Sequence, residues 1–170
     1  GHVFDEPAAQ LATAIRDSGA PEIARAVGAC FTGALEIALH CDFVYTTNAT
    51  RCGDTHTKFG LRPTWGMSQT LSRAVGQRRA RELSFTAKTF NGAQAAVWGI
   101  ANESFDTVEA LDDALAATCA QIIANSTEAV AAMKDLYRLA EREEGIRASL
   151  ESELGLKYKI SDTSERLSKF

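Results

Sequence analysis

A glycine-bearing turn followed by a carboxylate is the part of this chain best suited to chemistry. An apolar run of strand length at residues 23–27 leads into the turn GACFTG at residues 28–33, and a helix-like segment follows at residues 34–40. A strand that turns into a helix leaves the first backbone N–H groups of that helix unpartnered, so the turn can bind an anion or a developing oxyanion. Glu36 follows Gly33 by three residues. We therefore expect an N–H donor and a carboxylate at one spot.

The segment around this turn resembles the crotonase (enoyl-CoA hydratase/isomerase) superfamily. The matching pattern is Gly28-x4-Gly33-x2-Glu36-Ile37-Ala38-Leu39-x-Cys41-Asp42, then Gly53, Gly60, Pro63, Gly66 and Gln69-x-Leu71, in register without a gap. The glycines alone are weak signals, whereas their combination with the segment EIALHCD is specific. Fainter matches continue to the C-terminus. Nothing before Pro21 resembles the superfamily's N-terminal units, so we expect the chain to correspond to the C-terminal two-thirds of a longer protein.

The resemblance implies an α/β fold, a crotonase-like spiral of ββα units with a C-terminal helical trimerisation region. We expect residues 1–105 to form the core and residues 106–170 the helical oligomerisation region. The second part holds successive amphipathic helices, the first with an apolar stripe of Val108, Leu111, Leu115, Cys119 and Ile122. Such stripes must be buried against the core or another subunit. A homotrimer or a dimer of trimers is implied by the resemblance.

Local patterns predict the remaining elements. We expect helices at 6–18, 67–75, 77–87 and 93–98, with Gly76 and Gly99 as breaks, and a strand at 41–45. Residues 46–60 read as polar and turn-rich, with Asp54 able to start a short helix. Residues 100–105 are expected to be extended. Asp106 with Glu109 is predicted to cap the helix that follows, and Ser126 or Thr127 the next one.

The chemistry implied by the resemblance is addition of water to an α,β-unsaturated acyl-CoA thioester. This reaction places negative charge on the thioester oxygen, which N–H donors must face, and it needs groups that move protons. The resemblance assigns one donor to the Gly33 N–H and the first catalytic carboxylate to Glu36. The second donor of the superfamily belongs to the N-terminal turn that this chain does not match. The alternative for Glu36 is a carboxylate that only stabilises a helix N-terminus.

The second carboxylate position of the superfamily, twenty residues after Glu36, holds His56. The usual segment there is Gly-x-Pro-Glu, whereas this chain has Gly53-Asp54-Thr55-His56. Three hypotheses follow. His56 takes over the acid/base role, because an imidazole can do so near neutral pH; Glu36 works alone, as in an isomerase or another single-carboxylate reaction; or the protein binds acyl-CoA without catalysis. Asp54 either contributes or only caps, and His56 is otherwise a polar wall residue.

The resemblance also implies contacts to the substrate. Five residues are expected to bind the substrate: Phe31, Thr32, Thr64, Trp65 and Gly66, with Trp65 at the acyl group. For Trp65 the alternative is packing in the core, the commoner place for a tryptophan. Lys169 and Phe170 resemble a CoA contact that is made from a neighbouring subunit. Coenzyme A enters as part of the substrate, and we expect no separate cofactor.

Composition and spacing argue against several other classes of function. A net charge of −4 disfavours a nucleic-acid partner, and the sequence has no apolar run as long as a membrane span. His40, Cys41, Cys52, Asp54 and His56 lie close in sequence, but no CxxC or HxxxH pair occurs, so we expect no metal site. A nucleophilic role for Cys30 or Cys41 is disfavoured. Four cysteines without a dense framework suit a reducing compartment, and the cytoplasm is expected.

Overall fold

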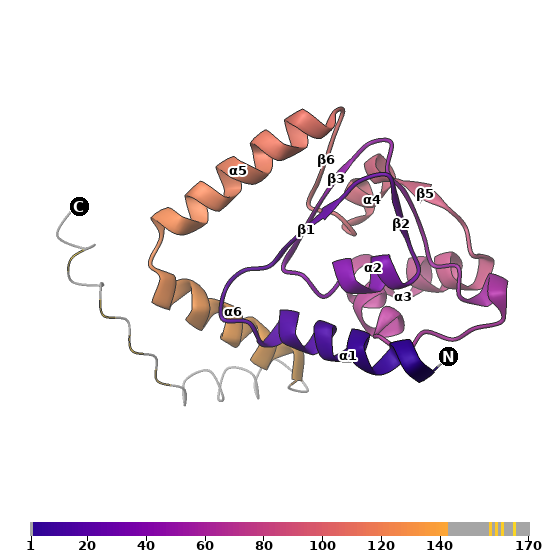
Figure 1. The fold of residues 1–170 in the computed structure, drawn as a ribbon, viewed down its shortest axis with the longest axis horizontal. Helices are drawn as coiled ribbons and strands as arrows, with labels where there is room; N and C mark the ends of the chain where they lie inside the picture. Colours follow the sequence, from indigo (N-terminus) through magenta and orange to yellow (C-terminus); the bar gives the residue numbers. More distant parts are fainter. Residues whose placement is uncertain (1, 143–156, 158, 160, 162–164, 166–170) are drawn as a thin grey trace. The chain divides into compact units, whose positions relative to one another are not determined.

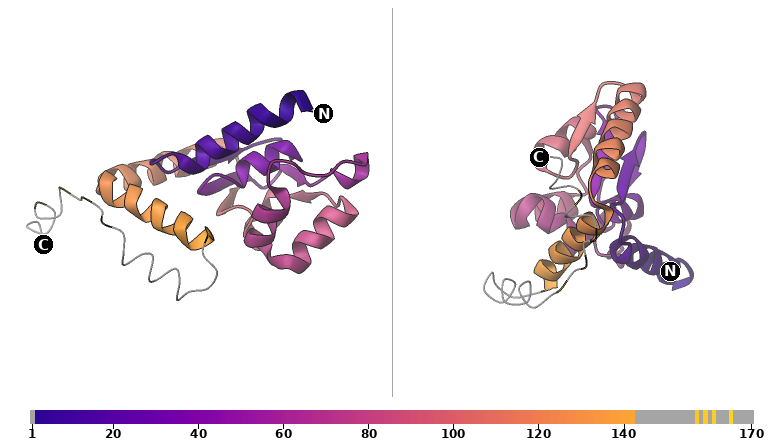
Figure 2. Two further views of the ribbon diagram at one scale, coloured as in Figure 1. Left: turned by 90° about the horizontal axis from the view of Figure 1, so that it is seen from below. Right: turned by 90° about the vertical axis from the view of Figure 1, so that its left-hand side faces the viewer.

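The computed structural model describes residues 2–142, 157, 159, 161 and 165. The predicted CoA contact at Lys169 and Phe170 lies outside these residues. The described chain divides into two compact units (Figures 1 and 2). The first holds the chain up to Ser18 and Glu22–Leu115, and the second holds Gly19–Pro21 and the chain from Ala116 on. Each unit is described below by itself.

One sheet of the first unit is wholly parallel. It has the order β1-β3-β6, with β1 at Ile23–Ala26, β3 at Phe43–Thr47 and β6 at Glu103–Phe105. Ile23 pairs with Phe43, and Tyr45 pairs with Glu103. The β3 strand begins two residues later than predicted, because the Asp42 carboxylate first accepts a hydrogen bond from the Glu22 N–H at 2.7 Å and holds a bend there.

The other sheet has the order β2-β4-β5, with β2 at Ala29–Phe31, β4 at Arg51–Gly53 and β5 at Phe90–Asn91. The β2–β4 pair is parallel and the β4–β5 pair is antiparallel. The chain therefore passes β1, β2, helix and then β3, β4, helix, which confirms the predicted spiral of ββα units (Figure 1). The sequence predicted turns where β2 and β4 lie, and this was wrong because strands of three residues show no alternation to detect.

The helices of the first unit pack against these strands or against one another. They are α1 (His2–Asp17), α2 (Gly33–Ala38), the 3-10 turn η1 (Thr57–Phe59), α3 (Met67–Thr86) and α4 (Gly92–Trp98). Gly76 breaks α3 with φ 75° and ψ 160°, and Gly99 ends α4, so both predicted breaks are confirmed. The largest apolar side chains of the shared core that are less than 2% exposed are Leu35, Met67, Leu71 and Leu83.

Two further helices follow, of which the first spans the boundary between the units and the second belongs to the second unit. They are α5 (Val108–Ala124) and α6 (Thr127–Arg142). Leu111 on the predicted α5 stripe is fully buried. The predicted Asp106 cap is wrong, because Asp106 accepts from Asn48 at 2.7 Å while the Thr107 hydroxyl accepts the Ala110 N–H at 3.1 Å. Ser126 Oγ accepts the Ala129 N–H at 3.4 Å and caps α6 as predicted.

Gly92 gives a stability test of the fold, because α4 starts directly against β3. A Cβ atom on Gly92 would lie 1.9 Å from the Thr47 carbonyl oxygen, which is backbone and cannot move aside. We expect Gly92→Ala to destabilise the protein by about 1–3 kcal/mol or more, as overpacking does. Urea unfolding followed by circular dichroism measures this.

The matched control is Gly19→Ala, since no atom lies within 4 Å of a Cβ built there. It should change stability by no more than about 0.5 kcal/mol in either direction. Equal unfolding midpoints for the two variants would contradict the close α4–β3 approach.

Candidate active site

The candidate site forms where the parallel strands β2 and β4 end side by side. Phe31 pairs with Gly53 at the last register position, and the Thr32 N–H donates to the Gly53 carbonyl at 2.9 Å. Beyond this point the segment after β2 enters α2 through Gly33, and the segment after β4 continues toward His56. Two segments that are about twenty residues apart in sequence thus bring their polar side chains to one edge.

Glu36 lies on the first turn of α2 and is buried, with 1% of its surface exposed. Its Oε1 atom accepts two backbone hydrogen bonds, from the Trp65 N–H at 3.1 Å and the Met67 N–H at 3.0 Å. Met67 is the first residue of α3, so the carboxylate lies at the N-terminal end of that helix, where negative charge is favoured. These two bonds fix the carboxylate and leave its Oε2 atom for other contacts.

That second oxygen faces His56. The Nε2 atom of His56 lies 3.5 Å from Glu36 Oε2, and the Nδ1 atom lies 2.6 Å from Asp54 Oδ1. The backbone N–H of His56 also donates to Asp54 Oδ1, at 3.2 Å. Because a carboxylate only accepts hydrogen bonds, the imidazole carries a proton on Nδ1 and turns Nε2 toward Glu36. Asp54 is 2% exposed and His56 is 7% exposed.

Asp54, His56 and Glu36 therefore form a buried row of a carboxylate, an imidazole and a carboxylate, which we call the Asp–His–Glu row. The sequence left open whether Asp54 contributes or only caps. In the structure its side chain binds both the backbone N–H and the ring of His56, so it orients the imidazole. Within the described chain no group of three His, Cys, Asp or Glu side chains is arranged to hold a metal ion.

Trp65 lies against Gly33, the predicted oxyanion donor. A Cβ atom on Gly33 would be 2.3 Å from Cζ3 of the indole ring, so the ring fills the space beside this glycine. The loop that carries Trp65 is fixed from behind by His40, whose Nε2 donates to the Trp65 carbonyl at 2.6 Å. The sequence analysis did not predict that His40 contacts this loop. Its sequence position beside Cys41 gave no signal, because the contact spans 25 residues.

The other predicted substrate residues lie in different places. Gly66 is the residue before α3, with φ 111°, and its α-carbon faces the His40 ring. Thr64 is exposed. The Phe31 ring packs against Gly53, with the Arg51 guanidinium 5.9 Å from its centroid, so Phe31 covers the strand pair. Thr32 adjoins Gly33, and its hydroxyl lies 2.5 Å from that of Thr55.

Two buried cysteines lie in the strands behind the site. Cys30 of β2 pairs directly with Cys52 of β4, and both thiols are free. The hydrogen bond between them lowers the pKa of Cys30, while the same bond, together with burial, raises the pKa of Cys52. Both thiols are enclosed in the apolar core and lie away from the surface.

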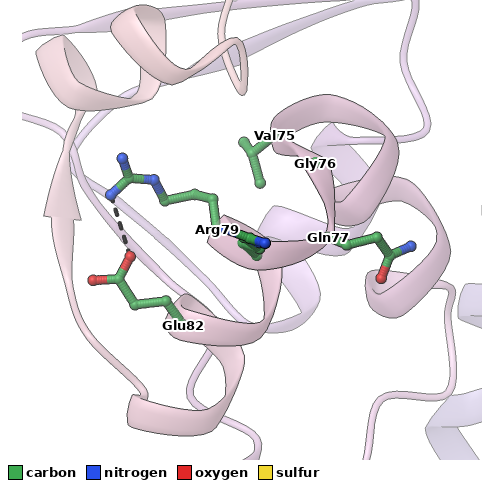
Figure 3. A pocket seen from close by; sticks show the side chains of 6 residues that line it. Val75, Gly76, Gln77, Arg79 and Glu82 are labelled. Atoms are coloured by element: carbon green, nitrogen blue, oxygen red, sulfur yellow. Dashed lines mark hydrogen bonds and ion pairs between the residues drawn. The ribbon is translucent and has the colours of Figure 1, made fainter.

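A shallow surface hollow lies elsewhere in the first unit, at the Gly76 break of α3 (Figure 3). It is lined by Val75, Gly76, Gln77, Arg78, Arg79 and Glu82. Arg79 pairs with Glu82 at 3.2 Å, and its guanidinium lies 4.4 Å from the centroid of the Trp98 ring. None of the predicted site residues lines this hollow.

None of the described helices has the length and apolar character needed to cross a membrane.

The contact between Gly33 and Trp65 can be tested by fluorescence. In a Trp98→Phe background Trp65 is the only tryptophan. We expect Gly33→Ala to push the indole ring off the α2 turn, because the added methyl group would overlap it. The emission maximum of Trp65 should then shift to longer wavelength. Gly19→Ala in the same background should leave it unchanged, and an unchanged spectrum in Gly33→Ala would refute the contact.

Comparison with known proteins gives a family match over nearly the whole chain. The model of the enoyl-CoA hydratase/isomerase family matches residues 2–168. A probable peroxisomal enoyl-CoA hydratase 1 of Arabidopsis thaliana is 37% identical over 94 residues, which is 55% of this chain and 36% of the relative. The mitochondrial enoyl-CoA hydratase domain-containing protein 2 of Bos taurus is 38% identical over 94 residues, 55% of this chain and 32% of the relative. The chain thus spans about a third of the curated relatives that it matches.

Solved structures agree on the fold. A putative enoyl-CoA hydratase from Thermobifida fusca YX, in complex with acetoacetyl-CoA, superposes with a TM-score of 0.77 at 27% identity. The match covers 98% of this chain and 61% of that one. A probable enoyl-CoA hydratase/isomerase from Mycobacterium abscessus gives a TM-score of 0.83 at 22% identity, covering 87% of this chain and 56% of that one. The second likeness concerns the fold alone.

Proposed function

Since the chain belongs to the enoyl-CoA hydratase/isomerase family, we propose that the protein binds an acyl-CoA thioester and adds water to a 2-enoyl-CoA. The proposal is supported by the names of the relatives and by the acetoacetyl-CoA complex of the Thermobifida fusca protein. Coenzyme A takes part as a portion of the substrate. The catalytic residues proposed are Gly33 for the oxyanion, Glu36 as base and His56 as the second acid/base group.

The observation that carries this proposal is the Asp–His–Glu row. A reaction that both removes and delivers a proton needs two groups at one centre. Glu36 Oε2 and His56 Nε2 are 3.5 Å apart, close enough for both to contact one water molecule or one substrate carbon. Asp54 holds the imidazole by Nδ1, as the third member of a catalytic triad does. The row supports His56 in place of the carboxylate usual at its position.

The proposed step balances its protons within the row. A water molecule attacks the β-carbon of the enoyl group as Glu36 Oε2 takes one of its protons. The electron pair moves to the thioester oxygen, which accepts from the Gly33 N–H. Protonated His56 then gives the Nε2 proton to the α-carbon, and the thioester carbonyl re-forms. Transfer of the proton from Glu36 to His56, across the 3.5 Å contact, restores the starting state.

Two alternatives remain open to the same experiment. Glu36 has one oxygen bound by two N–H groups and the other directed into the site, which suits a single-carboxylate isomerase that moves a proton along the acyl chain. The other alternative is a non-catalytic acyl-CoA-binding member. The two differ in turnover, because a binding protein keeps its affinity for the CoA ester without changing it.

Assembly and location form a further part of the proposal. We propose a homotrimer or a dimer of trimers formed through the helical region, because the large apolar side chains of Met133 and Tyr137 on α6 are exposed in the described chain. The contact of Lys169 and Phe170 with CoA of a neighbouring subunit belongs to this proposal. A cytoplasmic location and a role in fatty acid metabolism are proposed as well, although the names of two relatives give peroxisomal and mitochondrial sites.

The test follows the absorbance of the conjugated thioester as a short 2-enoyl-CoA is hydrated. Glu36→Gln removes the base, and His56→Asn removes the acid while keeping an amide donor near Asp54. Each should lower kcat by about 10²–10⁴-fold, the usual contribution of general acid–base catalysis. The matched control is Glu109→Gln, an exposed carboxylate on the first turn of α5, which should leave kcat unchanged.

The outcomes separate the alternatives. Loss of turnover in both variants supports the hydratase with paired Glu36 and His56. Loss in Glu36→Gln alone makes His56 a wall residue and favours the single-carboxylate reaction. No turnover by the wild-type protein, with a CoA ester bound in equilibrium dialysis, rejects the hydratase and leaves a binding protein.

A further inference from the structure

Thr32 has a backbone conformation that its side chain disfavours. Its φ is 50° and its ψ is −110°, outside the wells that L-residues occupy. Ala87 is the one other non-glycine residue of the described chain with positive φ, and its ψ of 30° lies in the ordinary left-handed well. A branched residue held in such a conformation costs stability, and such strain gathers at functional sites. Glycine would adopt the conformation without strain.

The backbone contacts of Thr32 do not explain why the side chain is there. The Thr32 N–H donates to Gly53, and the Thr32 carbonyl accepts from the Glu36 N–H, both at 2.9 Å. A glycine at position 32 would keep both bonds, because they use main-chain atoms. What a glycine would lose is the hydroxyl, whose Oγ1 atom lies 2.5 Å from Oγ1 of Thr55.

This hydroxyl contact lies next to the end of the β2–β4 pairing, between the segments that carry Glu36 and His56. It joins the residue directly after the last paired residue of β2 to the second residue after the last paired residue of β4. On one side Thr32 adjoins Gly33 and precedes Glu36 by one helical turn. On the other side Thr55 adjoins His56. The relative position of Glu36 and His56 therefore depends on how Thr32 and Thr55 are held.

We propose that Thr32 and Thr55 act as a positioning pair, whose hydroxyl hydrogen bond holds the oxyanion turn and Glu36 in register with His56. The proposal rests on the proposed function, because it concerns the geometry of the same acid–base groups. The hydroxyl that sets this register is supplied by the strained threonine and would be lost with a glycine. Neither threonine touches the reacting atoms in the proposed step.

Isosteric substitutions separate the hydroxyl from the shape. Thr32→Val and Thr55→Val each remove one hydroxyl and keep the branched side chain. Each should lower kcat on a 2-enoyl-CoA about ten- to a hundredfold, as a small misplacement of reacting groups does, with little change in KM. The double variant should be no worse than either single variant, because the two hydroxyls act as one unit. Thr32→Ser should restore most of kcat.

Thr32→Gly gives a readout that a purely structural role would not produce. It should raise Tm by roughly 2–5 °C, because strain is removed, and lower kcat as far as Thr32→Val does. Thr13→Val is the control, since Thr13 has an exposed hydroxyl bonded to the Ala9 carbonyl at 2.9 Å on α1. It should leave kcat unchanged. Additive losses in the double valine variant, or unchanged kcat in Thr32→Gly, would overturn the pair.

A second measurement tests the pair even if the protein proves not to be a hydratase. The ¹⁵N resonances of the His56 imidazole report its contacts with Asp54 and Glu36 without any substrate, and His56→Asn assigns them. Both valine variants should shift these resonances, whereas Thr13→Val should not. Unchanged resonances would refute the positioning pair, while absence of wild-type turnover with shifted resonances would refute only the hydratase.

Discussion

The parallel pairing of β2 with β4 is the constraint on which the site depends. Each strand has only three residues, yet the register Phe31 with Gly53 decides that the segments after them start level with each other. A slip of one residue would move Glu36 and His56 apart and turn every side chain of the strand to the opposite face. Two contacts support the pairing. The buried side chains of Cys30 and Cys52 lie at one register position, and the Phe31 ring packs over Gly53 at the next.

The N-terminal end of a helix is the second feature that positions the site. The N-terminal end of α3 binds Glu36 through two N–H groups, and it thereby links the two ββα units of the first compact unit. The same loop carries Trp65 against Gly33, so the carboxylate and the proposed oxyanion donor are both positioned by one stretch of chain between Pro63 and Met67. The His40 ring fixes this loop by donating a hydrogen bond to the Trp65 carbonyl. Local packing and the placement of the reactive groups therefore rest on shared contacts.

The sequence predicted those features that depend on local signals. Gly76, Gly99 and the Leu111 stripe were identified by type and spacing, and the motif around Glu36 indicated the family. The strands β2 and β4 were missed because three residues carry no periodicity. The contacts of His40 and of Thr32 could not be predicted either, since they join residues more than twenty positions apart. Only the backbone conformation shows that Thr32 is strained.

The burial of the Asp–His–Glu row has a consequence for the electrostatics of the interior. In the proposed step, transfer of a proton from Glu36 to His56 turns a neutral pair into an ion pair, so the net charge of the row stays the same while its dipole changes. Regions of low dielectric respond strongly to a change in net charge and much less to a dipole of a few ångströms. Under the proposed mechanism, the row of Asp54, His56 and Glu36 would therefore move a proton without changing the net charge that is buried there.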